Sequence, residues 1–152
     1  MGHRTTEWEL RGNLMGSKMQ TGLLLILGTI VSLVGWMAIY PGDASVTAES
    51  AAKLMADPTL AKWGMLMGFG GMGAVFIGFL NISRKMAAGG GAGSSYANIS
   101  AIMALVLVVL MAIGISIEWA VTEASNATEG ASLMLHSAAL ETPFSLFGGI
   151  LL

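Results

Sequence analysis

The sequence predicts an all-α protein, a polytopic transmembrane helical bundle, and two observations lead to this prediction. First, 55% of the 152 residues are hydrophobic and only 11% are charged, whereas a soluble domain carries about 25% charged residues. The mean hydropathy is +0.74. Second, three uncharged stretches of 19 or 20 residues are long enough to cross a hydrocarbon core of about 30 Å. We therefore expect an integral membrane protein that has the lipid bilayer as a partner.

Three complete spans are predicted over residues 21–40, 63–82 and 99–117. Aromatic residues that favour the membrane interface mark their ends: Trp36, Tyr40, Trp63, Tyr96 and Trp119. A fourth apolar stretch, 131–152, contains Pro143 and two ionisable residues. It is either one complete span that is broken at Pro143 or a short outer helix followed by a truncated span.

The distribution of Lys and Arg predicts the orientation. Five basic residues precede the first span or lie between the second and third spans: Arg4, Arg11, Lys18, Arg84 and Lys85. Only Lys53 and Lys62 lie on the opposite side. Because basic residues favour the cytoplasmic side of a membrane, we expect a cytoplasmic N-terminus, and we place the protein in a prokaryotic plasma membrane.

Four segments organise the chain. Residues 1–20 are expected to form a cytoplasmic or interfacial segment, in which Trp8 can lie on the membrane surface. Residues 21–88 form a first helical pair with an outer amphipathic helix. Residues 96–152 form a second helical pair, whose last helix is broken or cut off. Between them, Gly and Ser dominate residues 89–95, which have the composition of a flexible linker.

The two helical pairs resemble a tandem repeat. In each pair, a span that ends near a Trp leads to a short outer interfacial helix. These outer helices are predicted over residues 46–56 and 128–140. A start signal for the next helix follows, a capping side chain and then Pro, as Asp57-Pro58 in the first pair and Thr142-Pro143 in the second. The two Pro residues lie 85 positions apart, and the two Trp residues lie 83 apart.

Small residues recur along one face of the second span, at intervals of three and four positions. Such a stripe lets the backbone of another helix approach closely. Its members are Gly64, Gly68, Gly71, Ala74 (or Val75) and Gly78. The first span has a weaker stripe of the same kind, made by Gly28, Ser32 and Gly35. These faces are expected either to pack inside one bundle or to dock the chain onto another subunit.

Three ionisable residues lie within or near membrane depth: Glu118, His136 and Glu141. Such residues are rare there and are candidates for binding ions or protons. The alternative for Glu118, which precedes Trp119, is an interfacial carboxylate in contact with water. If 131–152 is one span, Glu141 lies near mid-membrane and must be protonated or paired. Otherwise Glu141 and His136 are simply interfacial.

The 12 Met residues allow two interpretations. Thioether and imidazole ligands suit Cu(I), and Met65, Met67 and His136 all map to the outer half of the predicted bundle. However, Met is also a good helix former and a flexible packing residue, and helical residues two positions apart do not face each other. No cofactor is therefore predicted, and copper stays as an alternative.

The sequence carries no catalytic constellation: it has no Gly-x-Ser-x-Gly, His-Glu-x-x-His or P-loop motif and no Cys. Seven Lys and Arg residues at a net charge of −2 exclude a broad nucleic-acid surface. We therefore expect a non-enzymatic accessory or structural subunit of a larger membrane complex, with other membrane subunits as partners. One alternative is a small transporter or channel, oligomeric with its own copies, that uses Glu118 and Glu141. Another is a subunit beside a copper or other redox centre of a membrane enzyme.

Overall fold

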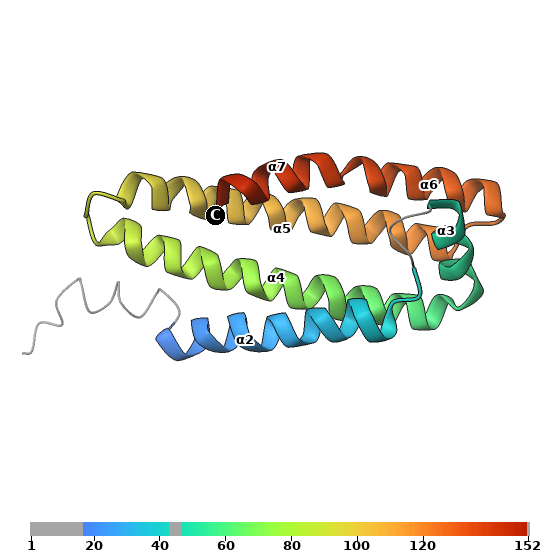
Figure 1. Cartoon of the computed structure of the whole chain (residues 1–152), viewed down its shortest axis with the longest axis horizontal. Helices are drawn as coiled ribbons and strands as arrows, with labels where there is room; N and C mark the ends of the chain where they lie inside the picture. Colours follow the sequence, from blue (N-terminus) through green and yellow to red (C-terminus); the bar gives the residue numbers. More distant parts are fainter. Residues whose placement is uncertain (1–16, 43–46, 152) are drawn as a thin grey trace, which may run out of the picture.

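The computed structural model describes residues 17–42 and 47–151, and the regular elements in these ranges are helices (Figure 1). In chain order they are α2 (Lys18–Val34), η1 (Gly35–Ile39), α3 (Thr47–Ala56), α4 (Pro58–Ala88), α5 (Ser94–Thr122), α6 (Ala127–Ala139) and α7 (Glu141–Leu151). η1 is a π-helical turn that continues α2. The all-α prediction is therefore confirmed for the described residues. Most of the interfacial segment expected over residues 1–20, Trp8 included, lies outside them.

Three helical stretches are long and apolar enough to cross a membrane. They are α2 with η1, α4 and α5, which have 22, 31 and 29 residues. They contain the three predicted spans, except that Tyr40 lies one residue beyond η1. At a rise of about 1.5 Å per residue, α4 and α5 are each roughly 45 Å long, so their ends project beyond a hydrocarbon core of about 30 Å. The described chain is compatible with an integral membrane protein.

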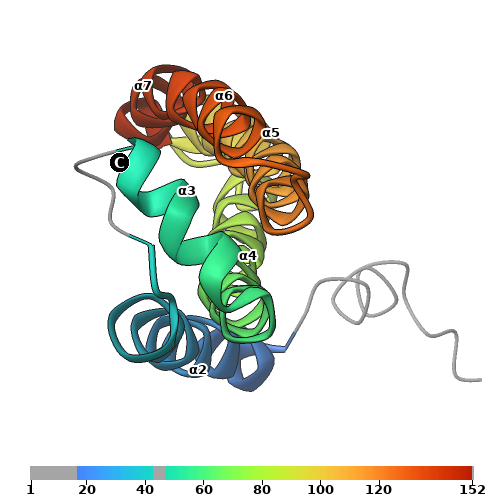
Figure 2. The same cartoon turned by 90° about the vertical axis from the view of Figure 1, so that its right-hand side faces the viewer.

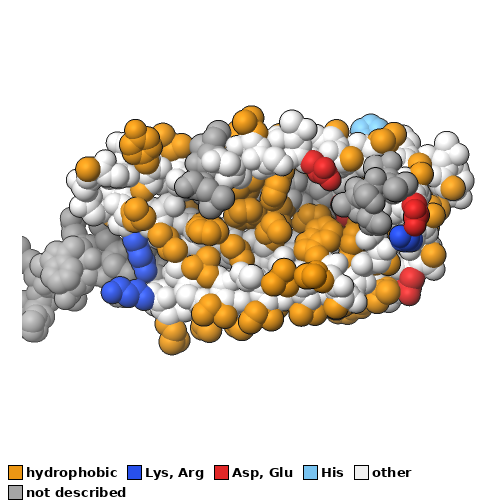
Figure 3. Space-filling view, in the orientation of Figure 1, with side chains coloured by type: hydrophobic (Ala, Val, Ile, Leu, Met, Phe, Trp, Pro, Cys, Tyr) orange, Lys and Arg blue, Asp and Glu red, His pale blue; other side chains and the backbone are white. Residues whose placement is uncertain are grey.

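The helices form an open arc. α2, α4, α5 and the α6–α7 pair lie side by side in that order, and α3 lies across one end, called the α3 end below (Figures 1 and 2). In the described part of the chain, α2 contacts α4 but none of α5, α6 and α7. The arc therefore has a concave face between α2 and the α6–α7 pair, which faces the viewer in Figure 3. Hydrophobic side chains cover the middle of this face.

The predicted small residues of α2 and α4 pack against each other. A Cβ atom on Gly28 would lie 2.7 Å from the carbonyl oxygen of Gly71 and 3.1 Å from the Cβ of Ala74. A Cβ on Gly71 would in turn clash with the backbone of Ser32. Because these atoms belong mostly to the backbone, the two helices can approach this closely only where side chains are absent or very small.

The same contact continues toward both ends of the two helices. Gly35 lies against the backbone of Gly68, and a Cβ on Gly64 would lie 2.6 Å from the Cα of Tyr40. At the other end, a Cβ on Gly78 would lie 2.7 Å from a leucine side chain of α2. All eight predicted small residues therefore lie between α2–η1 and α4, inside the chain, and do not form an open face.

The predicted start of α4 is confirmed. Oδ1 of Asp57 accepts a hydrogen bond from the N–H of Leu60 at 3.0 Å, and Pro58 is the first helical residue. Helices are observed at both places where the sequence predicts short outer helices: they are α3 and α6. Asn126 caps α6 by accepting a hydrogen bond from the N–H of Glu129 at 2.9 Å.

The linker between α4 and α5 is shorter than the predicted 89–95. α5 begins at Ser94, so the connection consists of residues 89–93. Within it, Gly90 has a φ of +66°, a backbone conformation that only Gly adopts readily. The two Ser residues of the expected linker belong to the first turn of α5, because Gly90 already reverses the chain.

The predicted start of the last helix at Thr142-Pro143 is wrong. α7 begins at Glu141, which places Pro143 at the third helical position. A missing N–H is harmless there, because N–H groups of the first turn have no acceptor within their helix. The backbone of Leu140 is nearly helical, with φ −78° and ψ −14°. α7 therefore follows α6 directly, and only Leu140 interrupts the helix between them. Neither part alone has the roughly 20 residues that a span requires.

The α3 end has its own apolar core. Four helices contribute buried residues to it: Ala51, Leu54, Ala61, Met65, Val121 and Met134. At the surface nearby, Nζ of Lys62 lies 2.7 Å from Oε1 of Glu123 and 4.9 Å from the ring centroid of Trp119, which ties α4 to the end of α5. α3 packs mainly on α6, whereas α6 also packs along α5. α3 and α6 thus differ in packing, and the tandem repeat stays a prediction.

Candidate functional site

Glu118 lies where three segments meet. It belongs to α5, about one turn before that helix ends, and only 7% of the residue is exposed. Its Oε2 accepts a hydrogen bond from the hydroxyl of Tyr40 at 2.8 Å. Its Oε1 accepts one from the hydroxyl of Ser137 at 3.0 Å. The carboxyl group therefore joins the end of α2–η1 and the C-terminal part of α6 to α5.

The π-helical turn brings Tyr40 to this carboxyl group. The N–H of Tyr40 donates to the carbonyl of Gly35, five residues earlier, at 2.8 Å. Because each π-helical turn holds more residues than an α-helical turn, the side chains after it are rotated from the α-helical register. The absence of a side chain at Gly64 makes room for the Tyr40 backbone. Turns of this kind are frequent at functional sites.

The path of α6 places Ser137. α6 starts at its Asn126 cap and packs along α5 and against α3. Gly130 is buried in this contact, where a Cβ atom would lie 2.7 Å from Sδ of Met55. Seven residues later, about two helical turns, Ser137 lies on the same face of α6 and reaches Glu118.

Within the described residues, no ion pair involves Glu118. The ion pairs found in this part of the chain belong to Glu49 and Glu123. Its two donors are neutral hydroxyls, so they orient the carboxyl group without cancelling its charge. An isolated buried carboxylate is costly unless it is protonated or paired with a cation. A carboxylate accepts about four hydrogen bonds, and the two that are formed leave capacity for such a cation.

A cavity of about 200 Å³ adjoins Glu118. Its walls come from η1, α4, α5, α6 and α7 and include Trp36, Phe69, Leu110, Ser137, Glu141 and Phe144. The ring of Trp36 meets Tyr40 and Phe69 edge-on, with centroids 4.6 and 4.9 Å apart. A third edge-on pair, Phe76 of α4 with Phe144 of α7, has its ring centroids 6.0 Å apart. The cavity thus combines carboxyl groups with aromatic and apolar walls.

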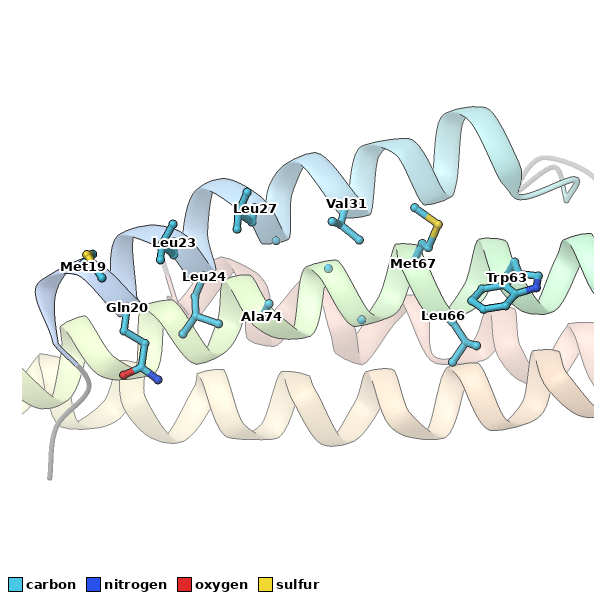
Figure 4. Close-up of a pocket in the computed structure, with 13 residues that line it drawn as sticks. Met19, Gln20, Leu23, Leu24, Leu27, Val31, Trp63, Leu66, Met67 and Ala74 are labelled. Carbon is cyan, nitrogen blue, oxygen red and sulfur yellow. The ribbon is translucent and has the colours of Figure 1, made fainter.

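A larger hollow of about 680 Å³ lies between α2 and α4 and does not include Glu118. Figure 4 shows apolar side chains of both helices around it, with Gln20 near one end and Trp63 near the other. This groove offers contacts for lipid acyl chains. Among the described residues, the side chains that line it include no carboxyl, hydroxyl or imidazole group with which to bind an ion.

The three residues predicted for copper lie in different surroundings. Met65 is fully buried in the core of the α3 end, Met67 lines the groove between α2 and α4, and His136 is exposed on α6. Nδ1 of His136 lies 2.7 Å from the carbonyl oxygen of Ser132 on the same helix. No group of three His, Cys, Asp or Glu side chains that could hold a metal is present in residues 17–42 and 47–151. The geometry adds no support for copper.

Two of the three ionisable candidates, Glu118 and Glu141, line the same cavity. Glu141, the first residue of α7, is exposed and lines the same cavity as Glu118. The carboxyl group of Glu141 thus lies at the same cavity as that of Glu118, whereas His136 does not line this cavity.

Sequence reasoning missed two partners of Glu118. The sequence predicts Tyr40 only as an interfacial anchor and predicts no role for Ser137. Both contacts depend on the π-helical turn and on the packing of α6, for which the residue pattern gives no signal. Comparisons of the chain with family models, with curated proteins and with solved structures found no match. The function is therefore argued from the chemistry of the cavity.

Proposed function

We propose that this chain is a small integral membrane carrier that loads a proton, or another small monovalent cation, at Glu118. The observation that carries the proposal is a carboxyl group that is 7% exposed, is bonded to two neutral hydroxyls and adjoins a cavity. Ionisable residues buried at membrane depth are typical of ion and proton pathways. The three long apolar helices support the membrane location.

The hydrogen bonds of Glu118 suit a group that exchanges a cation. A carboxylate keeps both hydroxyl donors when a cation arrives beside it, and a protonated carboxyl keeps at least the one on its carbonyl oxygen. Because the donors are neutral, the charge balance of the site depends on what Glu118 binds. Glu141 lines the same cavity and supplies a second carboxyl group along the route of entry.

The distribution of polar groups favours a carrier over a channel. From Glu118 toward the other end of α5, the buried side chains of that helix are apolar: Ala97, Ala101, Ala104, Leu107 and Met111. Within the described residues, these side chains offer no polar path along α5. In the predicted orientation the cavity loads from the outer side, and release into the cytoplasm requires the helices to rearrange. We expect η1 to move, because its hydrogen bonding already departs from that of an α-helix.

Proteoliposomes test this proposal. A pH-sensitive dye trapped inside vesicles that hold the purified chain reports proton entry after the external pH is lowered, with K⁺ and valinomycin balancing the charge. We expect uptake by the wild type and loss of uptake in Glu118→Gln. Glu49→Gln is the matched control, since Glu49 lies on α3 and pairs with Lys53 at 3.0 Å. Wild-type vesicles that take up neither protons nor a radioactive monovalent cation such as Na⁺ faster than empty ones, or full uptake by a folded Glu118→Gln chain, would overturn the proposal.

An accessory subunit is the second candidate, and the open arc favours it. Of the three long apolar helices, only α4 contacts α2 in the described chain, and hydrophobic side chains are visible across the middle of the concave face (Figure 3). Since α2–α4 packing occupies the small-residue faces, we expect a partner to use the concave face instead. Native mass spectrometry of the chain extracted from its own membrane separates the two candidates. A stoichiometric partner that persists in Glu118→Gln supports the subunit, and a monomer or homo-oligomer contradicts it.

A further inference from the structure

We propose that the cavity beside Glu118 binds a small alkylammonium ion from solution, that is, a nitrogen cation that carries methyl or short alkyl groups. This inference rests on the proposed loading of a cation at Glu118 and names the class of that cation. It is carried by the combination of carboxyl groups, aromatic rings and apolar walls around one cavity of about 200 Å³.

The oxygen atoms of the cavity are too few for a bare divalent metal ion. The side chains that supply oxygen are Glu118, Glu141 and Ser137, whereas Ca²⁺ takes six to eight oxygen ligands. An alkylammonium ion needs only one carboxylate beside its charge. Its alkyl groups gain from leaving water for apolar walls such as Leu110.

The aromatic side chains supply the second part of the recognition. A cation is attracted to the face of an aromatic ring within about 6 Å, most strongly to Trp, and aromatic cages bind methylated ammonium groups in this way. Trp36, Phe69 and Phe144 all line the cavity. Trp36 also packs edge-on against Tyr40, whose hydroxyl binds Glu118. The aromatic cluster is therefore connected directly to the carboxyl group that would pair with the cation.

The size of the cavity limits the ligand. Pockets for drug-sized molecules measure about 300–1,000 Å³, and this one is smaller, about 200 Å³. We therefore expect a cation with few heavy atoms. Tetramethylammonium and choline are suitable probes, and 3,3-dimethylbutan-1-ol is the neutral carbon analogue of choline.

Isothermal titration calorimetry of the full chain in nanodiscs tests the inference. Choline and tetramethylammonium are each titrated into the wild type, and the neutral alcohol is titrated as the control ligand. We expect the cations to bind at least tenfold more tightly than the alcohol. Glu118→Gln should lose at least tenfold in affinity, Trp36→Leu several-fold and Glu141→Gln about threefold. Glu49→Gln should bind like the wild type, and equal unfolding temperatures establish that the variants are folded.

Three results would overturn the inference: no binding of either cation, equal binding of choline and the alcohol, or wild-type affinity in a folded Glu118→Gln chain. If the free cations do not bind while a co-purifying chain is lost in Glu118→Gln, the cavity takes a basic side chain of a partner instead. The outcome for the carrier is separate. Glu118-dependent proton uptake without choline binding leaves the carrier standing. Choline binding without vesicle uptake of either protons or radioactive choline removes the carrier and keeps the binding site.

Discussion

The hydroxyl of Tyr40 lies 2.8 Å from Oε2 of Glu118, although 78 positions separate the two residues. Tyr40 follows α2–η1, the first of the three long apolar helices, and Glu118 lies near the end of α5, the third. Neither α2 nor η1 packs against α5 in the described chain, so this hydrogen bond is a side-chain bridge across the arc. Ser137 binds the other carboxyl oxygen. The two hydroxyls therefore link both the end of α2–η1 and α6 to one carboxyl group of α5.

Replacing Tyr40 by Phe removes one donor and keeps the aromatic ring. We expect the free energy of unfolding to fall by about 1 kcal/mol, the usual net value of such a hydrogen bond in water or membrane. Unfolding in mixed micelles, followed by circular dichroism, measures the change. Tyr96→Phe is the matched control, since Tyr96 is 76% exposed and should tolerate the loss of its hydroxyl. If the two variants lose equal free energy of unfolding, the hydrogen bond between Tyr40 and Glu118 does not stabilise the fold.

The close contact of α2 and α4 makes Gly71 intolerant of a side chain. A Cβ there would lie 2.5 Å from the carbonyl oxygen of Gly28, so Gly71→Ala must push the helices apart. We expect a loss of about 1–3 kcal/mol, typical of overpacking. Gly70→Ala is the control, because no atom lies within 4 Å of its added Cβ and Ala favours the helix by about 1 kcal/mol. If the two variants are equally stable, the packing of α2 on α4 is incorrect.

The cap of α4 is expected to stabilise the first turn of that helix. Asp57→Ala removes the acceptor for the N–H of Leu60, and the usual cost of losing such a cap is about 1 kcal/mol. Asp57→Asn keeps an acceptor oxygen and should lose much less. Hydrogen exchange at the first amides of α4 measures the effect, with faster exchange expected only in the Ala variant. Unchanged exchange there would contradict a capping role.

The pair of Lys62 and Glu123 predicts a pH dependence. The hydrogen bond from Lys62, and then its positive charge, lower the pKa of Glu123 in the folded chain. A lowered folded-state pKa contributes stability above the unfolded value, about 4.3 for Glu, and this contribution is lost as the pH falls through the folded value. Glu123→Gln should therefore be less stable than the wild type at neutral pH and equal to it in strongly acidic buffer. A difference that persists in acid would exclude the pair as its cause.

Composition and local spacing predicted the parts of this fold that local chemistry determines. The uncharged stretches became α2, α4 and α5, and Asp57-Pro58 started a helix because its cap needs only neighbouring backbone groups. The period of the small residues indicated a close helix contact. It could not tell whether the other helix belonged to the same chain, because period alone does not identify the partner.

The site itself depended on contacts that no local pattern encodes. Glu118 was a candidate from its type and depth alone, and the π-helical turn that delivers Tyr40 follows no recognisable signal. The start of α7 predicted from Pro143 is wrong for a related reason, because Pro is accepted at any position in the first turn of a helix. Pro143 therefore locates the start of α7 only to within one helical turn, and the helix in fact begins at Glu141.

Infrared difference spectroscopy of Glu118 tests the central claim most directly. Spectra of the chain in nanodiscs, recorded in acidic and alkaline buffer, report each carboxyl group that gains or loses a proton. If Glu118 loads a cation, the difference spectrum contains a carbonyl band of a buried carboxyl that is absent in Glu118→Gln, and choline suppresses this band in the wild type. A difference spectrum that is unchanged by Glu118→Gln would show that this carboxyl group does not exchange its proton, and would contradict the account.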